Sequence, residues 1–439
     1  MNRRKIALGT AALAAGLMAL PAMAQNEQFI PVLSYRTGAY APNGTPFANG
    51  MVDYYNMINE RDGGINGVKL LVEECETGYA TDRGVECYDR LKGKGPTGAA
   101  FFNPLSTGIT FAVTDKAPID KMPIITMGYG RSESADGSVF PWNFPLLGTY
   151  WSAADMAVQH VAAKSGGRAG LKDKKIFLVY HDSPYGKEPI ALLENYAKLD
   201  GFQFTALPVA HPGTEQKSTW LQIRQQRPDW VLLWGWGIMN STSIKEAAAV
   251  NYPRDKMIGV WWSGAEPDVI PAEAGAKGYN ALTLQHGSGT FPVHSDIVKN
   301  VYDKNKGMGK KEEMGHVLYN RGMLNAALGV EAIRKAQSRY GNKPLTGEQV
   351  RWGLENLSVD ATRIAAMGMD GMIQPVKISC ADHEGVRRAR VHQWNGKAWD
   401  FVSGWYEADI SRIGPMYKAA AAKYAADKKI APRDCSKES

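Results

Sequence analysis

The sequence predicts an α/β protein built from two lobes, each with a parallel sheet covered by helices. Short apolar segments typical of strands alternate with amphipathic helical segments from about residue 29, as in parallel sheets with helical crossovers. The alternation begins again near residue 175. A chain of 439 residues is also long enough for two domains. We therefore expect two α/β lobes and not one continuous sheet.

The first half of the chain supplies the elements of the first lobe. Apolar patterning predicts strands at 29–35, 68–73, 98–102 and 123–127, and helices at 46–60, at 81–92 and through Phe111. A segment rich in glycine and proline, 37–44, is expected to be a loop between the first strand and the first helix.

The second half repeats the pattern and then changes. Strands are expected at 175–180, 203–209, 229–234 and 256–261, and helices at 186–199, 214–225, 241–250 and 319–337. Near the end, 387–394 and 398–402 flank Asn395-Gly396, which is a strong hairpin signal. An alanine-rich helix is expected at 415–429.

The N-terminus has the features of a secretory signal peptide. Residues 3–5 are basic, residues 6–20 are apolar, and Ala22 and Ala24 are small residues at the −3 and −1 positions of a cleavage site before Gln25. The apolar run is shorter than the ~20 residues that span a bilayer, so a retained anchor is the weaker alternative. No cysteine follows the site to carry a lipid. We expect residues 1–24 to be removed and the mature protein to be periplasmic.

Charge and cysteine content narrow the possible classes of protein further. Removing the three basic residues of the signal leaves 48 basic against 44 acidic residues, a mild excess that does not favour nucleic-acid binding. The four cysteines of an exported chain favour disulfides, and three pairings are possible. We favour Cys75–Cys87 and Cys380–Cys435 over the other pairings and over free thiols. Zinc is disfavoured because no CxxC pair accompanies them.

Motifs for catalysis or cofactor binding are missing from the sequence. There is no P-loop, no GxGxxG after a strand, no HExxH and no GxSxG, and the eight histidines are dispersed. We therefore expect no enzyme activity, no cofactor and no metal site. An exported hydrolase is the alternative, and it would need a nucleophile–base pair that the sequence does not offer.

Polar and aromatic residues follow the expected strands instead. Ser106 and Thr107 come after strand 98–102 and open a helix, where hydroxyls and free backbone N–H groups suit a carboxylate. A plain helix N-cap is the alternative. Because ligands of open α/β sheets bind outside the carboxyl ends of strands, the aromatic residues there could stack on an apolar or aromatic ligand. They are Tyr129, Trp234, Trp236, Trp261 and Trp262.

Several short motifs together carry a family resemblance. They are TGAYAPNG at 37–44, GGING at 63–67, Cys75 at the end of a strand, Tyr185-Gly186, and PDWV at 228–231. The chain resembles the periplasmic solute-binding proteins of ABC importers, in the branched-chain-amino-acid-binding-like (type I) group. That resemblance covers nearly all of the mature chain. It implies two Rossmann-like lobes joined by a three-segment hinge, with the ligand between them.

The resemblance also implies boundaries and contacts. Lobe 1 would contain residues 25–147 and 284–369. Lobe 2 would contain residues 148–283 and 370–439, which include the C-terminal tail. Positions that match ligand contacts of the family are Tyr40, Asn43, Ser106, Thr107, Tyr129, Tyr150, Trp151, Tyr185, Trp236, Trp261, Trp262 and Tyr319. The implied partners are a small-molecule ligand and an ABC permease in the inner membrane, and we expect a monomer.

The sequence departs from the family at one informative place. Amino-acid binders of this group carry an acid after the strand that here ends at Trp261-Trp262, and Glu266 is the nearest acid. An unpaired ammonium in a closed cleft is costly, although cation–π contacts could replace part of the pairing. We therefore favour an aromatic or apolar carboxylate as ligand. The alternatives are a branched-chain or other amino acid or amide, and a sensory role in which the same fold presents its ligand to a receptor.

Overall fold

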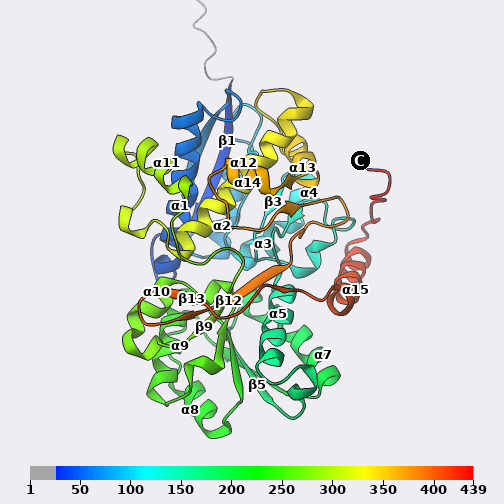
Figure 1. Cartoon of the computed structure of the whole chain (residues 1–439). Coiled ribbons are helices and arrows are strands. Elements are labelled where there is room, and N and C mark those ends of the chain that lie inside the picture. Colours follow the sequence, from blue (N-terminus) through cyan, green and yellow to red (C-terminus); the bar gives the residue numbers. More distant parts are fainter. Residues whose placement is uncertain (1–25, 439) are drawn as a thin grey trace, which may run out of the picture.

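The computed structural model describes residues 26–438 and contains two α/β lobes (Figure 1). Lobe 1 lies at the top of the view with the first strands, and lobe 2 lies below it with the larger sheet. The expected signal peptide lies outside the described residues. Among the helices of the described part, none is long and apolar enough to cross a membrane.

Lobe 1 has a short-stranded parallel sheet. Strands β1 (Glu27–Ser34) and β2 (Lys69–Glu76) pair in parallel, as do β3 (Ile124–Ile125) and β4 (Asn143–Phe144). The segment expected as a strand at 98–102 joins these pairs through two isolated bridges, Phe29 with Ala99 and Phe102 with Ile124. This segment is not a continuous strand, and Gly98 at its start has a left-handed φ of 78° that departs from the extended strand backbone.

Helices cover this sheet. They are α1 (Ala41–Asp62), α2 (Thr81–Leu91), α3 (Thr107–Thr114), α4 (Ala117–Asp120), α11 (Pro292–Asn300), α12 (Val317–Tyr340), α13 (Gly347–Glu355) and α14 (Ala361–Ala366). The short strands β10 (Ser358–Val359) and β11 (Val376–Lys377) lie on either side of α14 in the chain and pair antiparallel. Helices α1 and α12 pack closely, because a Cβ added to Gly50 would lie 2.1 Å from the Tyr319 carbonyl oxygen.

The expectation of a loop across 37–44 was wrong in its second half. Helix α1 begins at Ala41, so Asn43 and Gly44 are helical. Pro42 fits the first turn, where its missing N–H has no partner to lose. The consequence is that the side chain of Asn43 leaves the helix on its buried side.

Lobe 2 has a larger mixed sheet in the order β13-β12-β9-β8-β7-β5-β6. Strands β5 (Lys175–His181), β6 (Gln203–Val209), β7 (Trp230–Trp234), β8 (Met257–Gly259) and β9 (Asn280–Thr283) are parallel. The C-terminal hairpin of β12 (Arg388–Trp394) and β13 (Trp399–Phe401) adds antiparallel strands, and β14 (Tyr406–Glu407) pairs with β12. The expected hairpin is thus confirmed, whereas the strand expected at 256–261 ends at Gly259.

The helices of lobe 2 are α5 (Tyr150–Ala163), α6 (Pro184–Lys187), α7 (Ile190–Asp200), α8 (Lys217–Gln226), α9 (Ile238–Ala249) and α10 (Glu266–Val269). Trp261–Ser263 forms a 3₁₀ turn after β8. The last helix, α15 (Ile410–Lys428), packs beside both lobes, against α5 and the 3₁₀ turn Ser132–Ala135 (Figure 1).

Both favoured disulfides are present. Cys75–Cys87 joins β2 to α2, and Cys380–Cys435 ties the C-terminal tail to the body. No free cysteine is found in residues 26–438. The Cys380–Cys435 disulfide closes a loop with a sequence separation of 55 residues. By the loop-entropy relation, this closure stabilises the folded state by about 4 kcal/mol.

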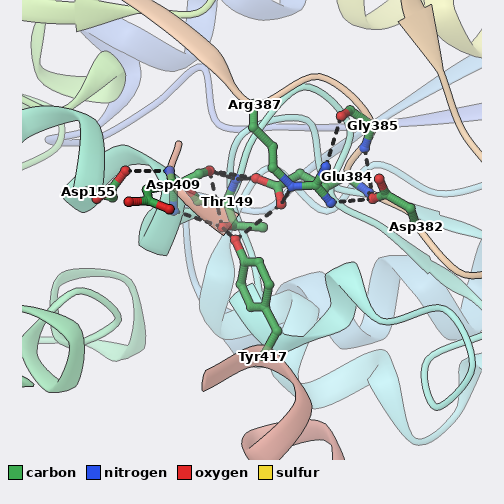
Figure 2. Close-up of polar contacts among 9 residues, drawn as sticks. Thr149, Asp155, Asp382, Glu384, Gly385, Arg387, Asp409 and Tyr417 are labelled. Carbon is green, nitrogen blue, oxygen red and sulfur yellow. Dashed lines mark hydrogen bonds and ion pairs between the residues drawn. The ribbon is translucent and has the colours of Figure 1, made fainter. Parts of the chain in front are cut away.

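The chain passes between the lobes before α5, after β9 and before β12, which is the three-segment hinge of the predicted fold. Polar groups at two of these crossings form what we call the hinge cluster. It consists of Thr149, Glu384, Arg387 and Tyr417 (Figure 2), together with Ser152, whose hydroxyl donates to Glu384 (2.5 Å). The fully buried Glu384 carboxylate accepts hydrogen bonds from the Thr149 amide (2.9 Å), Arg387 Nε (2.7 Å) and the Tyr417 hydroxyl (3.1 Å). With the Ser152 hydroxyl, each of the two carboxylate oxygens has two hydrogen-bond donors.

Candidate functional site

A pocket lies between the two lobes. Most of its lining residues come just after the carboxyl end of a parallel strand, where ligands of open α/β sheets bind. Lobe 1 contributes Tyr35, Tyr79, Leu105, Ser106, Thr107 and Tyr129, and lobe 2 contributes Tyr150, Tyr185, Trp236 and Trp262.

The lobes are closed over this cavity. The indole N–H of Trp236 donates to the Tyr35 hydroxyl across the cleft (3.1 Å), and that of Trp262 donates to the Gly128 carbonyl (2.7 Å). The backbone also bridges the gap, from the Ile238 amide to the Ala39 carbonyl (3.0 Å). These direct bonds hold the two lobes together over the pocket.

One end of the cavity carries hydroxyl groups at the start of α3. The Ser106 hydroxyl caps this helix by accepting from the Ile109 amide (3.4 Å). The next hydroxyl, that of Thr107, is buried and has no hydrogen-bond partner. Leu105 holds the turn in a left-handed conformation (φ 50°), and its amide donates to the Tyr129 hydroxyl (2.8 Å). The loop is therefore fixed while a buried donor remains unused.

The rest of the wall is aromatic. The rings of Trp236 and Trp262 meet edge to face with centroids 5.4 Å apart, and Tyr129 packs edge to face on Trp262 at 5.9 Å. The Tyr185 hydroxyl donates to the Gly235 carbonyl (2.9 Å). Because the polar tips of these rings already have partners, their faces and edges provide an apolar surface for a ligand.

The cavity lining carries no charged side chain. Burial raises the pKa of Tyr35, Tyr129, Tyr150 and Tyr185 well above the usual value, so their phenols stay neutral donors. Burial raises the pKa of Tyr79 as well.

Charges lie in a second layer behind Trp262. The fully buried Arg321 guanidinium lies 4.9 Å from the centre of the Trp262 ring, and burial lowers its pKa to about 9. Asp268 is also fully buried, and burial raises its pKa to about 6. Its carboxylate accepts from Asn43 and Asn240, at 2.9 Å each. Neither charge reaches the lining of the cavity.

Seven residues expected from the sequence line this cavity, and five do not. The seven are Ser106, Thr107, Tyr129, Tyr150, Tyr185, Trp236 and Trp262. Sequence reasoning missed Tyr35, Tyr79 and Leu105. Tyr35 ends the expected first strand, so its position at a strand end was a signal that could have found it.

Two of the five expected residues that do not line the cavity lie in the layer behind Trp262. Asn43 points at Asp268, as described above, and Trp261 donates through its indole to Gly128 (2.7 Å). Trp261 and Trp262 thus share one acceptor, while only the second ring faces the cavity. Glu266 accepts from the Val317 amide (3.0 Å) and is likewise absent from the lining.

The other three have separate structural contacts. Trp151 stacks on Tyr417 of the hinge cluster with centroids 5.3 Å apart. The Tyr319 hydroxyl donates to Asp53 (2.9 Å). Tyr40 lies at the rim of the cleft, where it bonds two histidines whose arrangement is described below. Among residues 26–438 no group of three or more histidine, cysteine or acidic side chains is arranged to hold a metal ion.

The comparisons with known proteins agree with this fold. Residues 27–398 match the family model described as periplasmic binding protein, and the chain therefore belongs to that family of solute-binding components of ABC transporters. Its members are exported solute-binding proteins and not enzymes, they bind small molecules, and they work with ABC permeases. No curated protein matches the sequence.

Solved structures show the same architecture. A protein from the Pseudomonas fluorescens group, named as an ABC transporter permease, is 44% identical with a TM-score of 0.86, covering 93% of this chain and 99% of that one. A branched-chain amino acid ABC transporter protein from Thermus thermophilus with bound valine is 19% identical (TM-score 0.73, 89% and 100% covered). A fatty acid ABC transporter substrate-binding protein from Thermomonospora curvata is 19% identical (TM-score 0.71, 88% and 94% covered). At 19% identity these two share the fold alone.

Proposed function

We propose that this protein captures a small carboxylate with an aromatic or apolar body in the periplasm and delivers it to an ABC permease in the inner membrane. The mature chain would begin at Gln25 and act as a monomer without turning the ligand over. One observation carries the ligand class: the cavity has hydroxyls at one end, aromatic faces elsewhere, and no charged side chain in its lining.

The hydrogen-bond donors and acceptors of the cavity favour an anionic ligand. Ser106 already accepts a hydrogen bond from the backbone, and Thr107 has no partner. Even if Tyr79 donates to Ser106 and Tyr150 to Thr107, the protons of Ser106 and Thr107 still need acceptors. A carboxylate supplies about four acceptor sites, and the start of α3 adds the favourable end of a helix dipole.

An α-amino acid fits this cavity less well. Its ammonium would need an acceptor or an anion, and the buried acid Asp268 has both oxygens engaged, by Asn43, Asn240 and the Ala265 amide. Leaving a charged ammonium unpaired in a closed cavity costs several kcal/mol. The valine-bound and fatty-acid relatives represent both ligand classes within this fold, so the distinction must come from the cavity itself.

A thermal-shift screen with matched ligands tests the proposal. Benzoate, benzamide and benzylamine share a ring and differ in their polar group, and 4-methylpentanoate is leucine without its ammonium. We expect the carboxylates to raise the melting temperature and the amine and leucine to leave it unchanged, because a ligand of the folded state raises its apparent stability. Stabilisation by leucine with no response to any carboxylate lacking an ammonium would refute the proposed ligand class.

A further inference from the structure

A cluster of one tyrosine and two histidines joins the lobes at the rim of the cleft. The Tyr40 hydroxyl of lobe 1 lies 2.8 Å from His181 Nε2 and 2.9 Å from His211 Nδ1, both of lobe 2. The two imidazoles come from the adjacent ends of the paired strands β5 and β6, with ring centres 3.8 Å apart. We call Tyr40, His181 and His211 the rim cluster.

The rim cluster has one consistent arrangement of protons. His211 Nε2 faces the Asp182 carbonyl (3.2 Å), which can only accept, so this nitrogen carries a proton. In the neutral ring His211 Nδ1 is then the acceptor for the single Tyr40 proton. His181 Nε2 must therefore donate to the Tyr40 oxygen, and His181 Nδ1 accepts from the Ser183 hydroxyl (2.8 Å). This chain of hydrogen bonds requires a neutral His211 imidazole. A second proton on His181 would face the Ser183 hydroxyl, which can also accept, so it is the full burial of His181 that disfavours its charge.

Protonation breaks the chain. A second proton on His211 would point an N–H group at Tyr40, whose own proton would then have no acceptor. Two cations with ring centres 3.8 Å apart would also repel each other. Burial lowers the pKa of His181 to about 3, with His211 as the next cause, and burial lowers the pKa of His211 as well.

The surroundings offer the cluster little counter-charge. Tyr79 and Tyr185 face His181 with ring centres 6.4 and 6.2 Å away, and burial keeps both phenols neutral. Asp182 is the acid beside the imidazoles, and its carboxylate is paired with Lys187 at 2.7 Å. An imidazolium formed in the closed cleft is therefore poorly compensated.

We propose that the rim cluster is a pH-sensitive latch, which holds the ligand-free cleft closed while both imidazoles are neutral and releases it in acid. Opening the cleft separates Tyr40 from both histidines and exposes the fully buried His181 to water, where histidine has a pKa of about 6.5, whereas His211 is already exposed at the rim. A group with a depressed pKa in the closed form stabilises that form fully above about pH 6.5 and loses this contribution as the pH falls. Acid therefore favours the open form.

The latch also connects to the cavity. The Tyr40 ring packs on the Tyr79 ring with centroids 4.3 Å apart, and Tyr79 lines the cavity. Tyr40 is thus a positioning residue for one wall of the site. The proposal does not depend on which ligand binds, because the closed form and its protonation are properties of the chain itself.

Interlobe distances in the ligand-free protein test the latch. Asp82 and Glu215 are exposed, three and four residues after Tyr79 and His211 respectively, and residues 26–438 contain no free cysteine to interfere with labelling. Spin labels at Asp82→Cys and Glu215→Cys should report a shorter distance when the cleft is closed. The buried Glu188 carboxyl also joins the lobes, and its raised pKa favours the closed form in acid, so the distances are measured in Glu188→Gln protein. In that protein we expect the ratio of closed to open molecules to fall about tenfold between pH 7.5 and 5.5, the change for one group with an open-state pKa of about 6.5.

Variants separate the latch from other titrating groups. In the Glu188→Gln background, His181→Gln with His211→Asn keeps an amide donor and an amide acceptor near the original nitrogens but cannot titrate, so its distances should not change with pH. Tyr40→Phe should be mainly open at both pH values. Glu188→Gln is the control for a second interlobe contact, because the Glu188 carboxylate accepts from the Ser132 amide (3.1 Å) and burial raises its pKa to about 8. This carboxyl would titrate with the opposite sign.

An unchanged distance distribution in Glu188→Gln protein between pH 7.5 and 5.5 would overturn the latch, and so would a double histidine variant in that background that responds to pH like its parent. If a variant is poorly folded, a histidine NMR titration of the wild type decides the matter. The latch requires the pKa values of His181 and His211 to lie below 6.5 in ligand-free protein, and ordinary titration of both would contradict it.

Discussion

The hinge cluster lies at two crossings between the lobes and the rim cluster joins the lobes across the cleft; each contains a tyrosine hydroxyl, but their chemistry differs. At the hinge, Tyr417 donates to Glu384, whose charge is paired with Arg387 (Figure 2). At the rim, Tyr40 bonds two histidines that must be neutral. The hinge contacts lie at the crossings themselves and need not separate when the lobes move. A charge pair suits a permanent contact, whereas a contact that must break and reform is easier to control when protonation decides it.

The largest expected effect comes from breaking the hinge pair. Arg387→Met would leave the fully buried Glu384 without its cation, which should lower the free energy of unfolding by about 3–5 kcal/mol. Denaturant unfolding followed by circular dichroism measures this change.

The neighbouring arginine provides the matched control for that variant. Arg388 pairs with Glu407 at the surface, with side chains 45% and 64% exposed, so Arg388→Met should cost less than about 1 kcal/mol. Equal losses in the two variants would mean that the hinge cluster is not the permanent contact described here.

A second prediction concerns the cavity between the two clusters. Trp262→Ala removes an aromatic face of the cavity, and we expect it to weaken binding of the best carboxylate from the screen at least tenfold. Trp234 is equally buried but does not line the cavity, so Trp234→Phe should leave affinity within about twofold. Calorimetric titration at pH 7.5 gives both values. Similar losses in the two variants would place the binding surface elsewhere.

A third prediction concerns Tyr40 of the rim cluster, which we expect to affect ligand affinity more than stability. Tyr40→Phe should weaken ligand binding severalfold, because the closed form loses its bonds to His181 and His211. Its unfolding free energy should change by about 1 kcal/mol or less, since a hydrogen bond at the rim is partly replaced by water. Parallel titrations and unfolding curves measure the two quantities, and a large stability loss with intact affinity would reverse these assignments.

The smallest expected effect belongs to the other tyrosine. Tyr417→Phe removes one donor from Glu384, which keeps Arg387, Ser152 and the Thr149 amide. We expect a loss of about 1 kcal/mol in unfolding free energy and no change in ligand affinity. A drop in affinity without a stability loss would show that the hinge also sets the closing equilibrium.

Much of the fold could be predicted from patterning, because buried strands and their turns leave local signals. Strand β6 has the expected bounds at 203–209, and the Asn395-Gly396 hairpin forms as expected. The expected end of the second strand at residue 73 was too early. The strand continues to Glu76, and the carboxylates of Glu74 and Glu76 accept hydrogen bonds from the Ser34 hydroxyl and from the Arg36 amide (2.5 and 2.7 Å).

That error explains one missed site residue. With β2 extended to Glu76, Tyr79 lies just after the strand end and lines the cavity.

Other differences could not be predicted from the sequence. Trp261 and Trp262 are consecutive in a 3₁₀ turn, and only the backbone path decides which ring faces the ligand. His181 and His211 are 30 positions apart and meet only because β5 and β6 pair in parallel.

The most direct test of the central claim is a calorimetric titration of the wild-type protein with 4-methylpentanoate and with leucine at pH 7.5. The two ligands share an aliphatic body and a carboxylate, and only leucine carries an ammonium. An uncharged cavity with unused hydroxyl protons predicts measurable binding of 4-methylpentanoate and binding of leucine that is at least tenfold weaker. Leucine binding tighter than 4-methylpentanoate would contradict the account, because it would require an anionic partner that the lining does not contain.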